Sequence, residues 1–361
     1  MLVAVALGVV AAMGCEKKDE GAAKPATSAA ASATASAKPE TKEIDPKMLA
    51  VFQALPAKLD DKDNPTTPEK VALGRQLYFD ARLSKNHDVS CNSCHDLATY
   101  GVDGKKVSDG HKKQNGTRNA PTVYNAAVQL SQFWDGRAKD VDEQATKPIL
   151  NPKEMAMPDE KAVVAVLSSM PEYVAAFEKA FPGEKAPVKL ANVGKAIGAF
   201  ERTLLTPSRF DKYLEGDKTA LTEPELAGLK LFLDTGCQSC HMGVGVGGTA
   251  MQKLGLVKPW PDDKDTGRME VTKQETDKMM FKVPILRNVA KTAPYFHDGS
   301  QATLEATIKA MGEYELGRAL TDDQAKSIAT FLGALTGTLP ADTKAPALPK
   351  SSPKTPKPDP N

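Results

Sequence analysis

The chain has 361 residues, of which 41% are hydrophobic and 26% charged, and its 47 Lys and Arg residues nearly balance 46 Asp and Glu residues. This length and apolar content suffice for a sizeable core in about two domains, and a formal net charge of +1 argues against a dedicated nucleic-acid binder. Five cysteines are too few for a disulfide scaffold of this size, and four of them form two CxxC pairs, so they point to cofactor attachment.

The first segment, residues 2–13, is a continuous run of apolar and small residues that ends at Gly14-Cys15. It is too short to span a bilayer, which needs about 20 residues, and a short apolar run before a small residue is typical of an export signal. Ala12-Met13-Gly14-Cys15 resembles a bacterial lipobox, in which the cysteine is lipidated and becomes the mature N-terminus. We therefore expect a signal peptide at residues 1–14 and lipidation of Cys15. Ordinary secretion and a disordered apolar tail are the alternatives.

Two further segments have the composition of irregular chain. Residues 15–45 are dominated by Ala, Ser, Thr, Lys and Pro, which have little to bury, and this predicts a flexible linker. Residues 341–361 are rich in Pro and Lys and predict an irregular tail. A polar linker between an acylated cysteine and a folded body suits a periplasmic protein that meets the membrane only through its lipid anchor.

The body between these segments carries helix signals. Thr67-Pro68-Glu69 puts an N-cap residue before proline at the first helical position, and predicts a helix to about Asp80. Capping boxes at 222–225 and 321–324 predict two more helices, the first ending near Leu233. Apolar stripes within 163–167 and 193–204 indicate others, and long alternating strand patterns are absent. We predict a mainly α fold whose helices are joined by long loops.

One sequence pattern occurs twice. Residues 74–80 parallel residues 228–234, and each copy precedes a CxxCH motif. Five further identities follow without a gap: Pro121, Asn125, Phe133, Asp135 and Gly136 match Pro284, Asn288, Phe296, Asp298 and Gly299. Because identities at fixed offsets indicate an internal repeat, the pattern predicts two related domains, at 46–212 and 213–340.

The strongest chemical signals are Cys91-Asn92-Ser93-Cys94-His95 and Cys237-Gln238-Ser239-Cys240-His241, which both have the c-type haem signature. Two thiols three residues apart on a turn can each add to one vinyl group of a porphyrin, and the next residue places its imidazole as an axial iron ligand. A zinc site would use the two CxxC pairs as four ligands, and a redox disulfide would need no histidine. We predict two covalent haems, one in each domain, with His95 and His241 as axial ligands.

Each iron also has a sixth coordination position to fill. Outside the two motifs the histidines are His87, His111 and His297. Met311 follows the second copy of the repeat at the start of a helical stretch, and cytochromes c use methionine as a distal ligand. At the same offset the first copy has Pro148, so the two haems are predicted to differ in ligation. Since a methionine on a helix is usually core packing, spacing alone leaves the role of Met311 open.

The body resembles the bacterial di-haem cytochrome c peroxidase family from Leu73 to Gly337. Besides the two CxxCH sites, the motifs that carry the resemblance are Gly110-His111, Arg118-Asn119-Ala120-Pro121-Thr122, Gln132-Phe133-Trp134-Asp135-Gly136-Arg137, Pro294-Tyr295-Phe296-His297-Asp298-Gly299 and Met311-Gly312. The resemblance implies a peroxidatic N-terminal haem and a C-terminal haem that receives electrons and has Met311 as an axial ligand. It implies His111 as a ligand of the resting N-terminal haem that leaves once the other haem is reduced. The alternative for His111 is a solvated loop histidine.

The same resemblance implies a distal site. Glu154 corresponds to an acid/base residue over the first haem, Gln144 to a neighbouring hydrogen-bond donor, and Pro148 to part of the same pocket. Peroxide cleavage requires such a group, because a proton must move from the inner to the outer oxygen. Without the resemblance, Glu154 is one of many surface carboxylates. Trp134 is implied to lie between the haems on the electron route, although buried packing would also use a tryptophan.

Asn119, Thr292 and Pro294 match a calcium site of this family at the domain interface, built partly from backbone carbonyls, which suit that cation. The function implied is reduction of hydrogen peroxide to water by a homodimer, with electrons from a small periplasmic donor, either a cytochrome c or a cupredoxin. Two alternatives come from other classes. One is a non-catalytic di-haem electron carrier, and the other is an oxidase that matures a protein-derived cofactor. Such oxidases carry a tyrosine where Met311 stands.

Overall fold

The computed structural model describes residues 44–361. The predicted signal peptide, the lipidation site Cys15 and nearly all of the predicted linker lie outside the described residues. In residues 44–361 the helices are α1 (Pro46–Leu49), α2 (Pro68–Phe79), α3 (Cys91–Cys94), α4 (Val141–Leu150), α5 (Glu160–Ser168), α6 (Pro171–Ala180), α7 (Leu190–Glu201), α8 (Arg209–Leu214), α9 (Glu223–Thr235), α10 (Met269–Thr272), α11 (Leu304–Leu316) and α12 (Asp322–Gly333). Short 3₁₀ turns lie at Ala81–Leu83, Leu97–Thr99, His111–Lys113, Ala126–Val128, Cys237–Ser239, Glu275–Asp277 and Val289–Lys291.

Local sequence signals place the main helices where they were predicted. The Thr67 hydroxyl accepts a hydrogen bond from the backbone N–H of Lys70, and Pro68 is the first residue of α2. Thr222 and Thr321 form the predicted capping boxes of α9 and α12. Helix α9 runs two residues past its predicted end and stops before Gly236, whose φ of 100° a glycine adopts readily.

Strands contribute little to the described residues, as the sequence predicts. The strands β1 (Met251–Lys253) and β2 (Met280–Lys282) form one antiparallel pair, in which Met251 lies opposite Lys282 and Lys253 opposite Met280. A mainly helical architecture is therefore confirmed. The pair matters for the site because β2 ends in a buried lysine.

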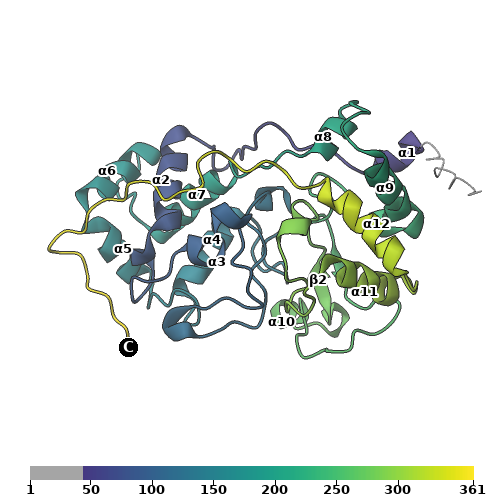
Figure 1. The fold of residues 1–361 in the computed structure, drawn as a ribbon. Coiled ribbons are helices and arrows are strands. Elements are labelled where there is room, and N and C mark those ends of the chain that lie inside the picture. The colour runs from purple at the N-terminus through teal and green to yellow at the C-terminus, as the bar shows by residue number, and fades with distance from the viewer. Residues whose placement is uncertain (1–43) are drawn as a thin grey trace, which may run out of the picture. The chain divides into compact units, whose positions relative to one another are not determined.

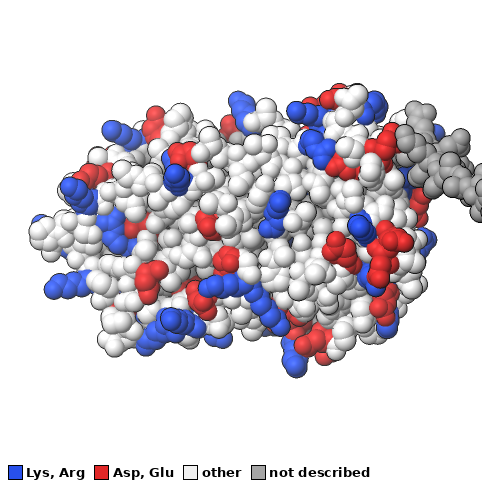
Figure 2. All heavy atoms as spheres, in the orientation of Figure 1, with Lys and Arg blue, Asp and Glu red and all other residues white. Residues whose placement is uncertain are grey.

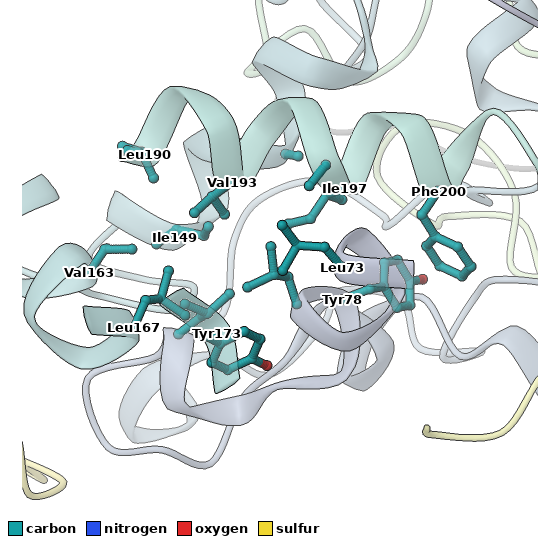
Figure 3. Packing of buried hydrophobic residues seen from close by; sticks show 14 of the residues in the cluster. Leu73, Tyr78, Ile149, Val163, Leu167, Tyr173, Leu190, Val193, Ile197 and Phe200 are labelled. Carbon is teal, nitrogen blue, oxygen red and sulfur yellow. The ribbon is translucent and has the colours of Figure 1, made fainter. Parts of the chain in front are cut away.

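Two hydrophobic cores lie along the described chain. The first gathers apolar side chains from α2, α4, α5, α6 and α7, including Leu73, Ile149, Val163, Tyr173 and Ile197, which converge in Figure 3. The second gathers side chains from α8, α9, α11 and α12, among them Phe210, Phe232, Ile308 and Phe331. In chain order, the first CxxCH motif follows α2 of the first core, and the second follows α9 of the second core.

One glycine in each core lets two helices cross at close range. A Cβ on Gly74 of α2 would lie 1.8 Å from the carbonyl oxygen of Ala196 on α7. A Cβ on Gly228 of α9 would lie 2.1 Å from the carbonyl oxygen of Ser327 on α12. Gly74 and Gly228 occupy the same position in the two copies of the sequence pattern.

Other corresponding residues share backbone conformation. Asn125 and Asn288 have φ of 60° and 64°, and Phe133 and Phe296 have φ of 66° and 67°. These left-handed conformations are uncommon for residues other than glycine. Their occurrence at corresponding positions therefore favours the predicted internal repeat. The buried hydroxyl oxygen of Thr206 lies 2.7 Å from Asn125 Nδ2 and 2.9 Å from Asn288 Nδ2, and accepts a hydrogen bond from each.

The two ends of the described chain pack on opposite cores. Near the start, the Phe52 ring contacts Phe210 edge-on at 5.5 Å between centroids, so it belongs to the second core. The tail 341–361 runs back along the first core (Figure 1). There the Ser169 hydroxyl lies 2.8 Å from that of Thr355. The tail has no helix or strand, as predicted, but it is bound to the body.

The predicted boundary at residue 46 groups Phe52 with the first half, whereas its side chain lies in the second core.

On the face shown in Figure 2, Lys and Arg side chains are interspersed with Asp and Glu, which agrees with the near balance of charges in the sequence. Within residues 44–361, the structure contains no helix with the length and apolar character needed to cross a membrane.

Candidate functional site

Both CxxCH motifs are wound into a single helical turn. Cys91–Cys94 forms α3, where the Ser90 and Ser93 side chains make a capping box. Cys237 opens the 3₁₀ turn after α9. In each motif the backbone N–H of the histidine donates to the backbone carbonyl of the first cysteine. The distance is 2.9 Å in the first motif and 3.0 Å in the second. None of the four cysteines within residues 44–361 forms a disulfide.

Each motif opens into a cavity of its own. The first cavity, of about 190 Å³, is lined by Cys91, Cys94 and His95 together with three of the predicted distal residues, Gln144, Pro148 and Glu154. The second, of about 220 Å³, is lined by Cys237, Cys240, His241 and Met311. The structure thus brings together most of the residues that the sequence assigned to each site, with His111 outside the wall of the first cavity, and the two cavities are similar in size.

The side chains present fit a haem in each cavity. Burial lowers the pKa of His95, and it lowers the pKa of His241 to about 4, so both imidazoles are neutral and can ligate iron. Both rings are buried, and backbone groups act on each imidazole, those of Pro121 and Gly101 on His95 and those of Val246 and Pro284 on His241. Burial raises the pKa of Cys237 to about 11. Its side chain therefore stays a thiol and does not become the thiolate that binds a metal.

The zinc alternative does not agree with this arrangement. The two CxxC pairs line different cavities, so their four sulfur atoms are not one ligand set. Among the described residues, no group of three or more His, Cys, Asp or Glu side chains is placed to hold a metal ion.

Glu154 lies just after α4, with its carboxylate at the wall of the first cavity. Its Oε1 accepts a hydrogen bond from Asn151 Nδ2 at 2.7 Å. Burial raises the pKa of Glu154, and the Arg137 charge and the Asn151 hydrogen bond oppose that rise. A carboxyl whose pKa is raised toward neutrality is suited to take up and release a proton.

Helix α4 supplies the other two distal residues. Gln144 and Pro148 are four positions apart, so they share one face of the helix, and both line the first cavity. The helix can lie this close to α7 because of Gly194 and Gly198. A Cβ on Gly194 would lie 2.4 Å from the carbonyl oxygen of Asp142, and one on Gly198 would lie 1.9 Å from an Asp142 carboxylate oxygen.

His111 is buried beside the first cavity, so it is not a solvated loop histidine. Its backbone N–H donates to the Glu154 carbonyl at 2.7 Å. The approach is close because Gly110 has no side chain, and a Cβ there would lie 2.0 Å from the Lys153 carbonyl oxygen. Gly110 lines the cavity, but the His111 side chain is not part of its wall. Lys112 and Lys113 follow with φ of 57° and 56°, a strained conformation for residues other than glycine.

Trp134 lines both cavities. Its Nε1 donates to the Asn119 carbonyl at 2.9 Å, and its ring stands edge-on to His297 at 6.4 Å between centroids. Asn119, Thr292 and Pro294 all line the second cavity, and the Asn119 amide nitrogen donates to the Lys105 carbonyl at 2.9 Å. The three residues predicted for calcium therefore lie in the wall of one cavity, and their metal binding stays a prediction.

Sequence reasoning missed two buried charged residues in these walls. Glu201, the last residue of α7, lines the first cavity, and burial raises its pKa to about 8. Lys282, the last residue of β2, lines both cavities. The signal for Glu201 was its position four residues after Ile197, on the apolar face of a predicted helix. Lys282 had only a weak signal, a lysine between Phe281 and Val283.

Comparison with known proteins gives one consistent result. A family model described as di-haem cytochrome c peroxidase matches residues 68–219. The chain is 49% identical over 298 residues to the cytochrome c551 peroxidase of Nitrosomonas europaea, which covers 82% of this chain and 88% of that protein. It is 45% identical over 316 residues to the cytochrome c551 peroxidase of Pseudomonas aeruginosa, covering 86% and 90% of the two chains.

Solved structures agree on the fold. A MauG-like protein associated with microbial copper homeostasis superposes with a TM-score of 0.70 at 29% identity, over 80% of this chain and 96% of that one. The diheme peroxidase BthA from Burkholderia thailandensis has a TM-score of 0.63 at 21% identity, over 82% and 94%. At that lower identity the likeness concerns the fold alone.

Proposed function

The chain belongs to the di-haem cytochrome c peroxidase family, and from this premise we propose that it reduces hydrogen peroxide to water with electrons from a small donor protein. The observation that carries the proposal is the buried carboxyl of Glu154 at the wall of the cavity that contains Cys91, Cys94 and His95. The family implies two haems. We propose that each is held covalently by one CxxCH motif, because each motif opens into a separate cavity.

When bound, the haem irons supply the redox chemistry that delivers two electrons to peroxide. The protein supplies proton handling at the first cavity, where the Glu154 carboxylate takes the proton from the inner peroxide oxygen and returns it to the outer one. The Asn151 side-chain amide donates to the Glu154 carboxylate, with 2.7 Å between Nδ2 and Oε1, and so fixes its position. Gln144 lines the same cavity and would be a hydrogen-bond donor there. With two protons and two electrons taken up in all, one hydrogen peroxide yields two waters.

Electrons enter at the second cavity in this proposal. Met311 and His241 both line it and would hold the haem there, and a thioether ligand would raise that haem's potential, as suits an entry site. Trp134 lies in the wall between the cavities, which places an aromatic ring on the path from one to the other. The donor would be a cytochrome c or a cupredoxin.

We propose that His111 is a removable ligand of the first haem. Two features of its loop support a switch between positions. The ring is buried next to the cavity without forming part of its wall, and the two lysines that follow hold strained backbone conformations. Strained segments with two possible arrangements are typical of switching loops.

Several further features of the proposal stay predictions. Calcium bound near Asn119, Thr292 and Pro294 would stabilise the wall of the second cavity. The matched backbone conformations and the shared Thr206 hydroxyl support two structural copies, each with one haem. Export to the periplasm, lipidation at Cys15 and a homodimer complete the proposal.

The two alternatives have less support. A non-catalytic electron carrier has no need of a buried proton-transfer group such as Glu154. An oxidase that matures a protein-derived cofactor would carry tyrosine where Met311 lines the second cavity.

Peroxide consumption with a reduced cytochrome c or cupredoxin tests the function directly. We expect turnover by the half-reduced protein, in which one haem is ferrous, and little by the fully oxidised protein, since His111 then still binds the first iron. Spectrophotometric oxidation of the donor measures both states. The absence of turnover in the half-reduced protein would favour the carrier.

Haem attachment has its own expected result. Denatured protein should retain two haems per chain, because thioether bonds survive unfolding. The double substitution Cys91→Ser and Cys94→Ser should leave one, and the matched pair Cys237→Ser and Cys240→Ser should leave the other. A pyridine haemochrome assay counts them, and two haems in either variant would contradict covalent attachment at that motif.

A further inference from the structure

The two cavities share a wall, which we define as the residues that line both: Asn119, Ala120, Pro121, Thr122, Gln129, Phe133, Trp134 and Lys282. Lys282 is the one charged residue of this set. It is buried, with 5% of its surface exposed. Its backbone N–H donates to the Trp134 carbonyl at 2.7 Å, and its ammonium donates to the Ser131 carbonyl at 2.7 Å. The lysine is therefore fixed within the shared wall by both its backbone and its side chain.

The Lys282 ammonium has no carboxylate within ion-pair distance among residues 44–361. The acidic group that acts on its charge is Asp135. The Asp135 carboxylate is already paired with Arg118 and Arg137, both within 2.8 Å. Since an ammonium has three N–H donors and one bonds Ser131, two are left for groups inside the cavities. A buried cation without its own counter-ion is unfavourable, so its presence suggests an anionic partner.

A haem in either cavity would bring such a partner, because each haem carries two propionate carboxylates and gains a negative charge on reduction. We propose that Lys282 provides a positive charge shared by both haem sites, which favours the reduced state of each and eases electron passage through the wall beside Trp134. This inference rests on the proposed function, since it needs a haem in each cavity.

Two physical arguments support the proposal. Charges interact more strongly in a water-excluded interior than in solvent, so one cation in the shared wall acts on both sides. Burial lowers the pKa of Lys282 to about 7, and Asp135 opposes that shift. A carboxylate in either cavity would oppose it further and keep the ammonium form at neutral pH.

The test compares three variants of the haem-loaded protein. Lys282→Gln removes the charge but keeps an amide that can donate toward the Ser131 carbonyl, and Lys282→Arg keeps the charge. Lys291→Gln removes the same charge from an exposed position. Haems are first counted in each protein, and the reduction of both haems is then followed spectroscopically against a series of redox mediators.

We expect Lys282→Gln to make reduction of at least one haem tenfold or more less favourable, which is a fall of 59 mV for a one-electron couple. Lys282→Arg and Lys291→Gln should stay within about threefold of the wild type. Unchanged potentials in a fully loaded Lys282→Gln protein would overturn the proposal, and so would an equal shift in Lys282→Arg. If Lys282→Gln fails to take up haem, the same fall in the potential of at least one haem is expected of Lys282→Met. A wild type with fewer than two haems would contradict the proposed function instead.

Discussion

Glu154→Gln is expected to lower peroxide turnover by the half-reduced protein at least about a hundredfold. The change keeps the size and polarity of the side chain and its contact with Asn151, but removes the base that we propose to carry the proton between the two peroxide oxygens. General acid–base catalysis supplies about 10²- to 10⁴-fold in rate, which sets the expected loss. Steady-state oxidation of a reduced donor measures it. Glu172→Gln is the matched control, because Glu172 is exposed on α6.

The same variant separates catalysis from folding. Glu154→Gln should bind both haems, and half-reduction should still produce the spectral change expected of the proposed departure of His111 from the iron. Turnover close to that of the wild type would remove Glu154 from the catalytic mechanism. A loss of turnover together with a loss of haem would show a structural role instead.

His111→Gly is expected to have the second large effect, with the opposite sign. The fully oxidised variant should turn over peroxide without prior reduction, because the ligand that blocks the first iron is absent. Turnover measured from the first seconds after adding peroxide to oxidised protein distinguishes it from the wild type, which should show a lag or no activity.

His87→Gly is the matched control for that experiment. His87 lies outside the first cavity, and its φ of 55° is a conformation that glycine adopts readily, so the substitution removes an imidazole with little backbone strain. If His111→Gly still requires prior reduction, or if His87→Gly also abolishes the requirement, His111 is not the removable ligand.

The parts of the fold that the sequence predicts are those with local causes. Thr67, Thr222 and Thr321 cap helices through bonds within four residues, so short sequence patterns contain the whole interaction. The CxxCH motifs are equally local, since one helical turn brings both cysteines and the histidine together. The sequence therefore predicts the helix starts well, and haem attachment at the two CxxCH turns stays a prediction.

The parts that the sequence could not predict depend on contacts between distant residues. Glu201 lines the first cavity at the end of α7, which α2 crosses closely at Gly74, and no sequence window around Glu201 contains that crossing. Lys282 belongs to both cavities because β2 lies against the segment of Trp134, nearly 150 positions earlier in the chain. The burial of His111 follows from its bond to the Glu154 carbonyl, which its polar loop sequence does not suggest.

The crossed packing of the chain ends restricts how this protein can be divided. Phe52, near the start, belongs to the core formed mainly by α8, α9 and α12, while Thr355, near the end, hydrogen-bonds Ser169, the residue after α5. A fragment that covers residues 46–212 would expose Phe52 and lack the tail, and one that covers 213–340 would lack the aromatic side chain that its core surrounds. Neither core is therefore completed by one consecutive stretch of sequence. A single-haem version is better obtained by changing one pair of cysteines in the intact chain than by cutting the gene in two.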